Sequence, residues 1–261
     1  MGDAGVTVAA TTGIGYSPSA PAEMQTVLSL DGYAPATGAR TIIYCHSAMG
    51  SAGEPLGGYT ASAPSGFELL TALPAAGYLV VAADLGGHQT WGNDTSVARV
   101  ADAIAWARSN GGRPGKVVLV GASMGGGLAQ VYARAHPGDV AALLLFAPVC
   151  DLDDFVVNDR AGQAASINAA YGGAYSPTSD GPTRSPVRFA AQLAGLPVQI
   201  WTSSQDTVTI PDAAASVAAA IGSSCDLHLA AVGEHGSETE FAWILANLPT
   251  VLGFLDATSA A

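Results

Sequence analysis

Short apolar runs alternate with amphipathic segments over most of the chain. Each apolar run is long enough for a buried strand; the runs occupy residues 24–30, 40–45, 78–83, 116–120, 140–147, 198–202 and 226–232. Apolar residues recur at helical spacing between them, over residues 65–77, 95–105, 124–136, 211–221 and 238–255. This alternation predicts an α/β fold with a mostly parallel central sheet that is covered by helices on both faces.

The domain organisation follows from where this rhythm starts and where it breaks. Residues 1–22 are small, polar and interrupted by proline, which indicates an N-terminal arm, and residues 23–261 form a single predicted domain. Segment 148–197 is too long for a simple connection and carries only one expected helix, at 185–193. We expect this segment to be a lid-like or substrate-binding insertion, with a surface excursion as the alternative. Its Asp151 and Phe155 are candidates for substrate contact.

The most specific motif is Gly121-Ala122-Ser123-Met124-Gly125, which follows a β-branched apolar run and precedes a helical pattern. This order is typical of a nucleophile elbow, in which a serine lies in a strained turn between a strand and a helix. The small residues two positions before and after the serine allow the neighbouring backbone to pack closely. Ser123 is therefore a candidate nucleophile.

A serine hydroxyl needs a histidine base and a group that orients this base. Of the five histidines, His136 ends the elbow helix and His228 alternates with leucines within a strand, so both favour structural roles. His235 lies in a glycine-flanked loop after the last strand, which favours it as the base. Asp206 directly follows a strand and precedes His235, so it is the candidate acid, and Asp151 is the alternative.

Together, these residues resemble the α/β-hydrolase superfamily. The resemblance rests on GASMGG between a strand and a helix, SSQDTV after a strand and the late GEHG, and it extends from about residue 26 to residue 255. It implies that Ser123 is the nucleophile, Asp206 the acid and His235 the base of a two-step acyl transfer to water. It also implies that neither a metal nor an organic cofactor takes part.

An oxyanion hole needs two preorganised donors. The first expected donor is the backbone N–H of Met124, which follows the nucleophile. By the resemblance, the second comes from the loop after residues 40–45, where the chain has His46-Ser47 and many family members have His-Gly. We therefore expect the backbone N–H of Ser47 to be the second donor, with His46 beside the substrate.

The loop after residues 78–83 is expected at the same end of the sheet. It carries Trp91, a large apolar side chain of a kind that loops usually avoid. Substrate contact and simple packing are both open for it. Asp84, His88 and His46 could be imagined as metal ligands, but their spacing matches no regular metal site.

Composition narrows the function. Charged residues make up 11% and hydrophobic residues 49% of the chain, and the net charge of −12 disfavours nucleic acid and anionic membrane surfaces as partners. Sparse charge and apolar loops favour a neutral small-molecule or lipid ester, so we expect a carboxylic ester hydrolase of the esterase or lipase kind. The alternatives are a peptidase of the prolyl-oligopeptidase-like type and a non-catalytic relative of the fold.

Three sequence features bear on the protein's location. No apolar run is long enough to span a membrane, and the first residues lack the basic and apolar regions of a signal peptide, so we expect a cytoplasmic protein. A second, weaker resemblance, carried by DLGG, WGN and FAPVCDL, is to hydrolases that are encoded by phages of high-GC actinobacteria, some of them tail-associated. It implies a virion-associated protein and an ester of the cell envelope as substrate.

Overall fold

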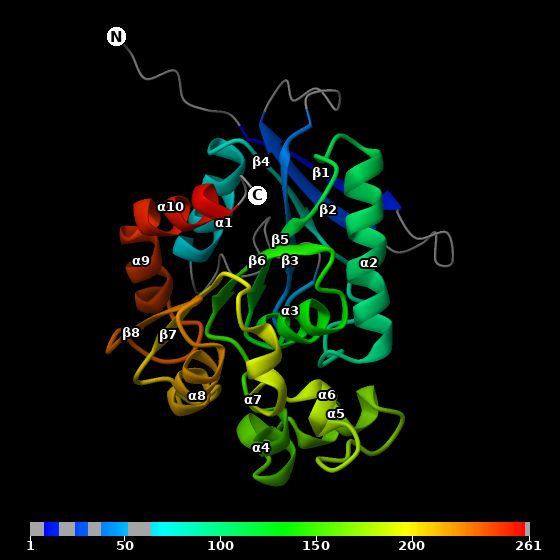
Figure 1. Ribbon diagram of the computed structural model, residues 1–261, viewed down its shortest axis with the longest axis vertical. Helices are drawn as coiled ribbons and strands as arrows, with labels where there is room; N and C mark the ends of the chain where they lie inside the picture. Colours follow the sequence, from blue (N-terminus) through cyan, green and yellow to red (C-terminus); the bar gives the residue numbers. More distant parts are fainter. Residues whose placement is uncertain (1–7, 16–23, 31–37, 52–63, 259–261) are drawn as a thin grey trace.

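The computed structural model describes residues 8–15, 24–30, 38–51 and 64–258. The strands form one eight-stranded sheet in the order β1-β2-β4-β3-β5-β6-β7-β8 (Figure 1). Their bounds are Val8–Gly15 (β1), Met24–Leu30 (β2), Arg40–Cys45 (β3), Tyr78–Ala82 (β4), Val117–Ala122 (β5), Val140–Phe146 (β6), Val198–Ser203 (β7) and Cys225–Ala230 (β8). Strands β3 to β8 are parallel, whereas β1 and β2 pair in antiparallel fashion. The mostly parallel sheet is confirmed, and each expected strand is present with ends that differ by no more than two residues.

Strand β1 was not expected, because residues 8–15 fall within the predicted N-terminal arm. The strand pairs with β2, and its register shifts between Thr11 and Ile14. Its sequence, VAATTGIG, contains small and polar residues and no clear apolar alternation. Backbone pairing at a sheet edge does not need such alternation, so the pattern could not reveal it. The rest of the arm, residues 1–7 and 16–22, lies outside the described residues.

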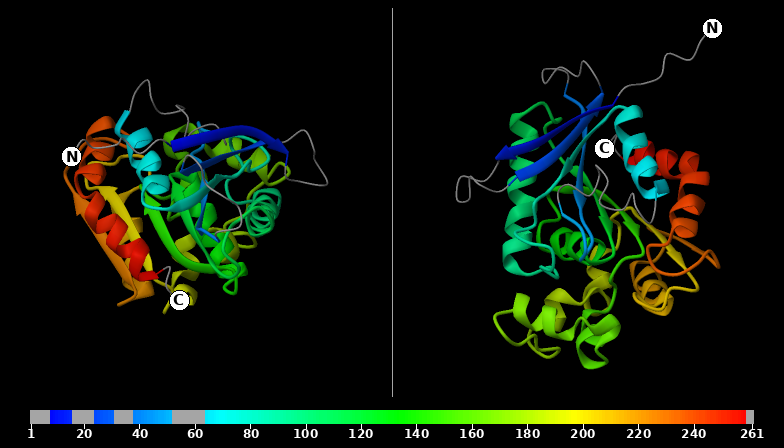
Figure 2. Two further views of the ribbon diagram at one scale, coloured as in Figure 1. Left: turned by 90° about the horizontal axis from the view of Figure 1, so that it is seen from above. Right: turned by 180° about the vertical axis from the view of Figure 1, so that it is seen from behind.

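Two layers of helices cover the sheet (Figures 1 and 2). Helices α2 (Asp94–Ser109), α3 (Met124–Ala135) and α8 (Pro211–Ile221) pack on one face, and α1 (Pro64–Ala75), α9 (Glu238–Ala246) and α10 (Leu248–Thr258) pack on the other. Strand residues alternate between the two layers: Ile43 belongs to the first cluster, and its neighbours Ile42 and Tyr44 belong to the second. This alternation explains why nearly continuous apolar runs form the parallel strands.

Several helix ends differ from expectation. Helix α2 is capped by Asn93, whose side chain accepts a hydrogen bond from the Ser96 N–H, so it begins before Thr95. Its buried face includes Val100 and Ile104, whereas Ala105, the last residue of the predicted helix 95–105, is exposed. The expected helix 238–255 is two helices, bent by 63° at Asn247. Ser65, at which the predicted helix 65–77 begins, lies within α1, and its side chain is outside the described residues.

Segment 148–197 is largely helical rather than irregular. It contains α4 (Leu152–Val157), η3 (Arg160–Gly162), α5 (Ala164–Ala170), α6 (Gly181–Arg184), α7 (Pro186–Phe189) and η4 (Ala190–Leu193). These elements gather at one end of the molecule (Figure 1). Arg184 donates a hydrogen bond to the Gly92 carbonyl at 2.9 Å, and Asn93 Nδ2 donates to the Ala170 carbonyl at 3.0 Å. The segment is therefore docked on the loop that precedes α2.

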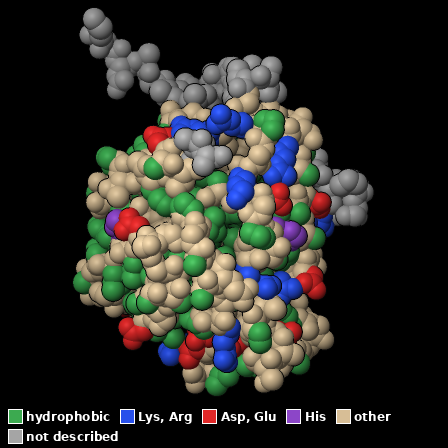
Figure 3. Space-filling view, viewed as in Figure 1, with side chains coloured by type: hydrophobic (Ala, Val, Ile, Leu, Met, Phe, Trp, Pro, Cys, Tyr) green, Lys and Arg blue, Asp and Glu red, His purple; other side chains and the backbone are tan. Residues whose placement is uncertain are grey.

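Among the described residues, no single helix is long and apolar enough to cross a membrane. Helices α9 and α10 would pass this test together by length and composition, but they are the two halves of the 63° bend. On the face shown in Figure 3, few charged side chains are scattered among hydrophobic and neutral ones. Cys45 and Cys150 are buried free thiols, and burial raises the pKa of each to about 12.

Candidate active site

Ser123 lies in the turn between β5 and α3, at the carboxyl edge of the sheet. Its backbone has φ 52° and ψ −117°, an uncommon conformation for a residue with a side chain. The Ser123 N–H donates to the Phe146 carbonyl at 2.9 Å, and the Ser123 carbonyl accepts from the Val149 N–H at 2.9 Å. These two bonds to the chain around the end of β6 hold the strained turn in place.

The two glycines of the motif are required by close contacts of the backbone. A Cβ atom on Gly121 would lie 2.6 Å from the carbonyl carbon of Gly125. A Cβ atom on Gly125 would lie 2.6 Å from the carbonyl oxygen of His46. Any side chain at either position would therefore force the backbone apart, which confirms the expected close packing around the elbow.

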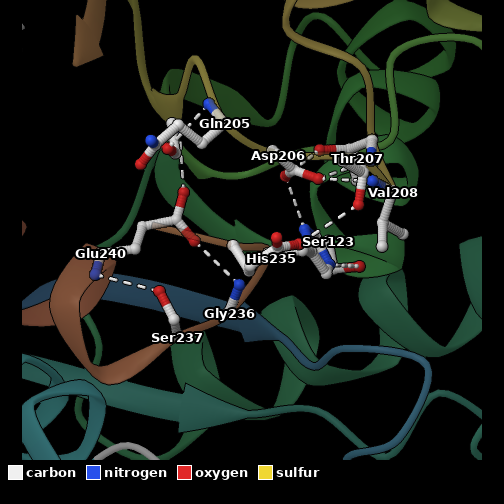
Figure 4. Close-up of polar contacts among 12 residues, drawn as sticks. Ser123, Gln205, Asp206, Thr207, Val208, His235, Gly236, Ser237 and Glu240 are labelled. Atoms are coloured by element: carbon white, nitrogen blue, oxygen red, sulfur yellow. Dashed lines mark hydrogen bonds and ion pairs between the residues drawn. The ribbon is translucent and has the colours of Figure 1, made fainter. Parts of the chain in front are cut away.

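The structure brings Ser123, His235 and Asp206 together (Figure 4). Ser123 Oγ lies 2.9 Å from His235 Nε2, and His235 Nδ1 lies 2.7 Å from Asp206 Oδ2. Asp206 is on the loop 204–209 after β7, here called the Asp206 loop, and His235 is on the loop 231–237 before α9, here called the His235 loop. The Asp206 side chain is fully buried and that of His235 is 19% exposed, so solvent reaches His235 but not Asp206.

Four hydrogen bonds hold the Asp206 carboxylate in its orientation. Oδ1 accepts from the N–H groups of Val208 and Thr209, and Oδ2 accepts from the Thr209 hydroxyl at 2.6 Å and from His235. Burial raises the pKa of Asp206, but the bonds from His235 and Thr209 outweigh this effect and leave its pKa below the usual value. Asp206 is therefore ionised at neutral pH. His235 Nδ1 must then donate to it, which leaves Nε2 to accept the Ser123 proton.

Side chains of other elements hold the His235 loop. Gln205 Oε1 accepts from the Gly233 N–H at 2.8 Å, and Glu240 Oε2 accepts from the Gly236 N–H at 2.8 Å (Figure 4). The sequence patterns did not predict Gln205, Thr209 and Glu240 as members of the site. A polar residue three positions after an aspartate, and Ser237-x-x-Glu240 before an apolar helix, were visible signals, but both are also common in ordinary turns and helix caps.

The loop after β3 passes beside the elbow. The contact of Gly125 with the His46 carbonyl places the backbone of residues 46 and 47 next to the first turn of α3. His46 is buried; its Nδ1 lies 2.8 Å from the Ser47 carbonyl, and burial lowers its pKa. A neutral His46 thus braces the loop that carries the Ser47 N–H. The Met124 N–H lies at the N-terminal end of α3, where helix amides lack partners within the helix.

Trp91, Phe155 and Asp151 were expected near the substrate, but their side chains contact other parts of the protein. Trp91 is only 4% exposed; its indole N–H donates to Ser166 Oγ at 3.1 Å, and its ring packs against Phe155 at 5.8 Å between centroids. Phe155 is 2% exposed. Asp151 caps α4 by accepting from the Asp154 N–H, so it does not replace Asp206 as the partner of His235. Of the two interpretations of Trp91, packing is the one that these contacts support.

The other three histidines, His136, His228 and His88, contact neighbouring residues outside the Ser123–His235–Asp206 chain. His136 stacks on Tyr132, and His228 stacks on Trp201 with ring centroids 3.8 Å apart. His88 Nδ1 pairs with the Gly50 carbonyl. Across the described ranges, no group of three His, Cys, Asp or Glu side chains is arranged to hold a metal ion.

Comparisons with known proteins extend this picture. Residues 56–179 match the family described as serine aminopeptidase, S33. No curated protein matches the chain in sequence. A solved prolyl endopeptidase superposes with a TM-score of 0.70 at 15% identity, and the superposition covers 97% of this chain and 39% of that one. The chain thus spans well under half the length of that enzyme.

Two esterases are similar over more of their length. One from Pyrococcus furiosus superposes with a TM-score of 0.65 at 14% identity, covering 97% of this chain and 92% of that one. Brefeldin A esterase, a bacterial homologue of human hormone-sensitive lipase, has a TM-score of 0.66 at 19% identity, covering 98% and 78%. At these identities the likeness establishes a shared fold.

Proposed function

We propose that this chain, which has the α/β-hydrolase fold, is a serine hydrolase of the superfamily that its motifs predicted, and that it cleaves carboxylic esters through an acyl-enzyme intermediate. The observation that carries this proposal is the continuous hydrogen-bonded chain Ser123–His235–Asp206 at the carboxyl edge of a parallel sheet. In such sheets, ligands bind beyond the carboxyl ends of the strands.

In the proposed mechanism, Ser123 Oγ attacks the ester carbonyl while His235 Nε2 takes up its proton. The negative charge on the carbonyl oxygen is stabilised by the N–H groups of Met124 and Ser47. The imidazolium is stabilised by the Asp206 carboxylate and then protonates the departing alcohol. Water enters next, loses a proton to His235 and hydrolyses the acyl-enzyme, which regenerates Ser123. All of these steps use side chains, backbone amides and water.

An ester substrate is favoured over a peptide because charged residues make up only 11% of the chain, so few of them exist to recognise the charged groups of a peptide. A peptidase is the second candidate, because the matched family is described as serine aminopeptidase and a prolyl endopeptidase shares the fold. An esterase from Pyrococcus furiosus and brefeldin A esterase share the fold as well, and they support the ester proposal. A small-molecule or lipid ester is therefore the proposed substrate.

Hydrolysis of p-nitrophenyl esters from acetate to palmitate would test this proposal on the wild type and on Ser123→Ala. We expect turnover that is lost in the variant, with an optimum chain length that reports the size of the acyl pocket. Aminoacyl and prolyl p-nitroanilides serve as the peptidase arm. Turnover of the anilides alone would replace the ester proposal, and a folded wild type that is inert on both substrate classes would favour the non-catalytic alternative.

The docked segment 148–197 is proposed to form one wall of the substrate site. Its contacts with residues 92–94 argue for a wall rather than a freely moving lid. Hydrogen exchange with and without a fluorophosphonate bound to Ser123 would decide between the two: a wall would keep its exchange rates, whereas a lid would slow on inhibition. The cytoplasmic location and the resemblance to phage-encoded hydrolases stay predictions, and a search for the protein in purified virions would test the second.

A further inference from the structure

Glu240 is a buried carboxylate that the proposed mechanism does not use. It lies in the first turn of α9 and is 1% exposed. Its Oε1 accepts from the Ser203 N–H at 3.1 Å, and its Oε2 accepts from the Gly236 N–H at 2.8 Å. Ser203 ends β7 just before the Asp206 loop, and Gly236 directly follows His235. One side chain therefore joins the bases of both loops (Figure 4).

An ordinary helix cap does not account for this arrangement. Ser237-x-x-Glu240 has the sequence of a capping box, in which the glutamate would bind the backbone N–H of the capping serine. The Ser237 side chain does accept from the Glu240 N–H, at 3.3 Å. The Ser237 N–H, however, donates to the Glu234 carbonyl, and the Glu240 carboxylate is directed to Gly236 and Ser203 instead.

The burial of Glu240 has an energetic cost that its bonds must offset. A carboxylate that is removed from water is stable only when it is well hydrogen-bonded. Burial raises the pKa of Glu240; its bonds to Gly236 and Ser203 and the charge of His235 oppose this rise, and the nearby charge of Asp206 adds to it. A glutamine at this position would fill the same space without the charge.

We propose that Glu240 is a positioning residue that fixes His235 against Asp206 and Ser123 by clamping the Gly236 amide to the end of β7. The inference rests on the proposed function, because it assigns Glu240 a role through His235. Three other side-chain supports of the His235 loop are weaker. Gln205 is exposed, the bond from the Thr207 hydroxyl to Glu234 Oε2 is exposed and 3.3 Å long, and the bond from the Val232 N–H to Ser203 Oγ is 3.4 Å long. Loss of the clamp should leave substrate binding intact and misplace the imidazole.

The test compares Glu240→Gln with Glu238→Gln, which makes the same charge change in the same helical turn. With the preferred p-nitrophenyl ester, we expect Glu240→Gln to lower kcat by roughly 10- to 100-fold with KM within about twofold, because small misplacements of reacting groups are costly. The rate at which a fluorophosphonate labels Ser123 should fall in parallel. Glu238→Gln should match the wild type in both measurements.

Each outcome decides the inference. Equal labelling rates and equal kcat in Glu240→Gln and the wild type would overturn it and leave the proposed function standing. A wild type that is neither labelled nor active would refute the proposed function, and this inference with it. If Glu240→Gln does not fold, Glu240→Asp decides: this variant keeps the charge but cannot reach both amides, so a wild-type kcat would overturn the inference and a reduced kcat with unchanged KM would support it.

Discussion

The nucleophile elbow and the two loops that carry Asp206 and His235 meet at one site, but they are held in different ways. The elbow is fixed by close contacts of the backbone: Gly121 and Gly125 leave no room for a side chain, and two backbone bonds secure Ser123. The loops are fixed mainly by side-chain hydrogen bonds. Asp206 accepts from N–H groups of its own loop, and Gln205 and Glu240 accept from N–H groups of the His235 loop.

Substitutions at the elbow and in the two loops should therefore act on different properties of the protein. The close packing of α3 against β3 and β5 depends on the two glycines of the elbow. A side chain at either position should therefore reduce the stability of the whole fold. The hydrogen bonds of the loops orient two side chains, those of Asp206 and His235, at the carboxyl edge of the sheet. Their loss should reduce activity far more than stability.

Asp206→Asn should have the largest effect on activity, and it tests the loops separately from the elbow. The amide would favour the wrong tautomer of His235, so we expect kcat to fall by roughly 10⁴-fold. The thermal midpoint should change little, since an amide can still accept hydrogen bonds from Val208 and Thr209. Ester turnover and circular dichroism measure the two effects. Asp151→Asn, which alters the cap of α4 and the bond that Asp151 accepts from Ser185, is the control; an equal loss of activity in it would contradict the assignment of Asp206.

Gly125→Ala tests the elbow. Its Cβ would press on the carbonyl of His46, so we expect a loss of about 3 kcal/mol or more in the free energy of unfolding. Urea denaturation and soluble yield would measure it. Gly253→Ala, in α10, is the matched control, because a Cβ there meets open space and should stabilise that helix by up to about 1 kcal/mol. A Gly125→Ala protein as stable as the wild type would refute the steric account.

Gln205→Ala should have a smaller effect. It removes the acceptor of the Gly233 N–H, but both groups are close to solvent, so water can take over the bond. We expect a loss of a few-fold in kcat and less than about 1 kcal/mol in stability. Steady-state kinetics and urea denaturation check the two values. A loss as large as that of Glu240→Gln would mean that burial is not what separates the two supports.

The smallest effect should be in the pH dependence of stability. The pKa of Asp206 is depressed, so its stabilisation is present above its usual value of 3.8 and is lost as the pH falls through its folded pKa. The pKa of Glu240 is raised, so its contribution is present below its usual value of 4.5 and is lost as the pH rises through its folded pKa. Relative to Glu240→Gln, the wild type should therefore lose stability as the pH rises above 4.5. Denaturation midpoints of the wild type and of Glu240→Gln, measured above pH 4.5, test this. If the pKa of Glu240 is not raised, the difference between the two midpoints will not change with pH.

Much of the fold was predictable because hydrophobic burial leaves a local record in the sequence. The apolar runs predicted seven of the eight strands, and Pro211–Ile221 was predicted to the residue. Strand β1 was missed because edge pairing uses backbone groups that every residue has. In segment 148–197, the helix expected at 185–193 is present as Pro186–Phe189 and Ala190–Leu193. The short helices before it were missed because they are stabilised by contacts such as Trp91 with Ser166, between residues distant in sequence.

The amino-acid sequence was enough to predict the α/β layering, the turn at Ser123 and the presence of Asp206 and His235 after strands at one edge of the sheet. These features follow from burial, from the steric demands of glycine and from chain direction, which are written locally. Only the tertiary structure decided that Trp91 packs against Phe155, that Asp151 caps a helix and that Glu240 joins two loops. A side-chain hydrogen bond depends on distances of a few tenths of an ångström between distant residues, and no local pattern records such distances.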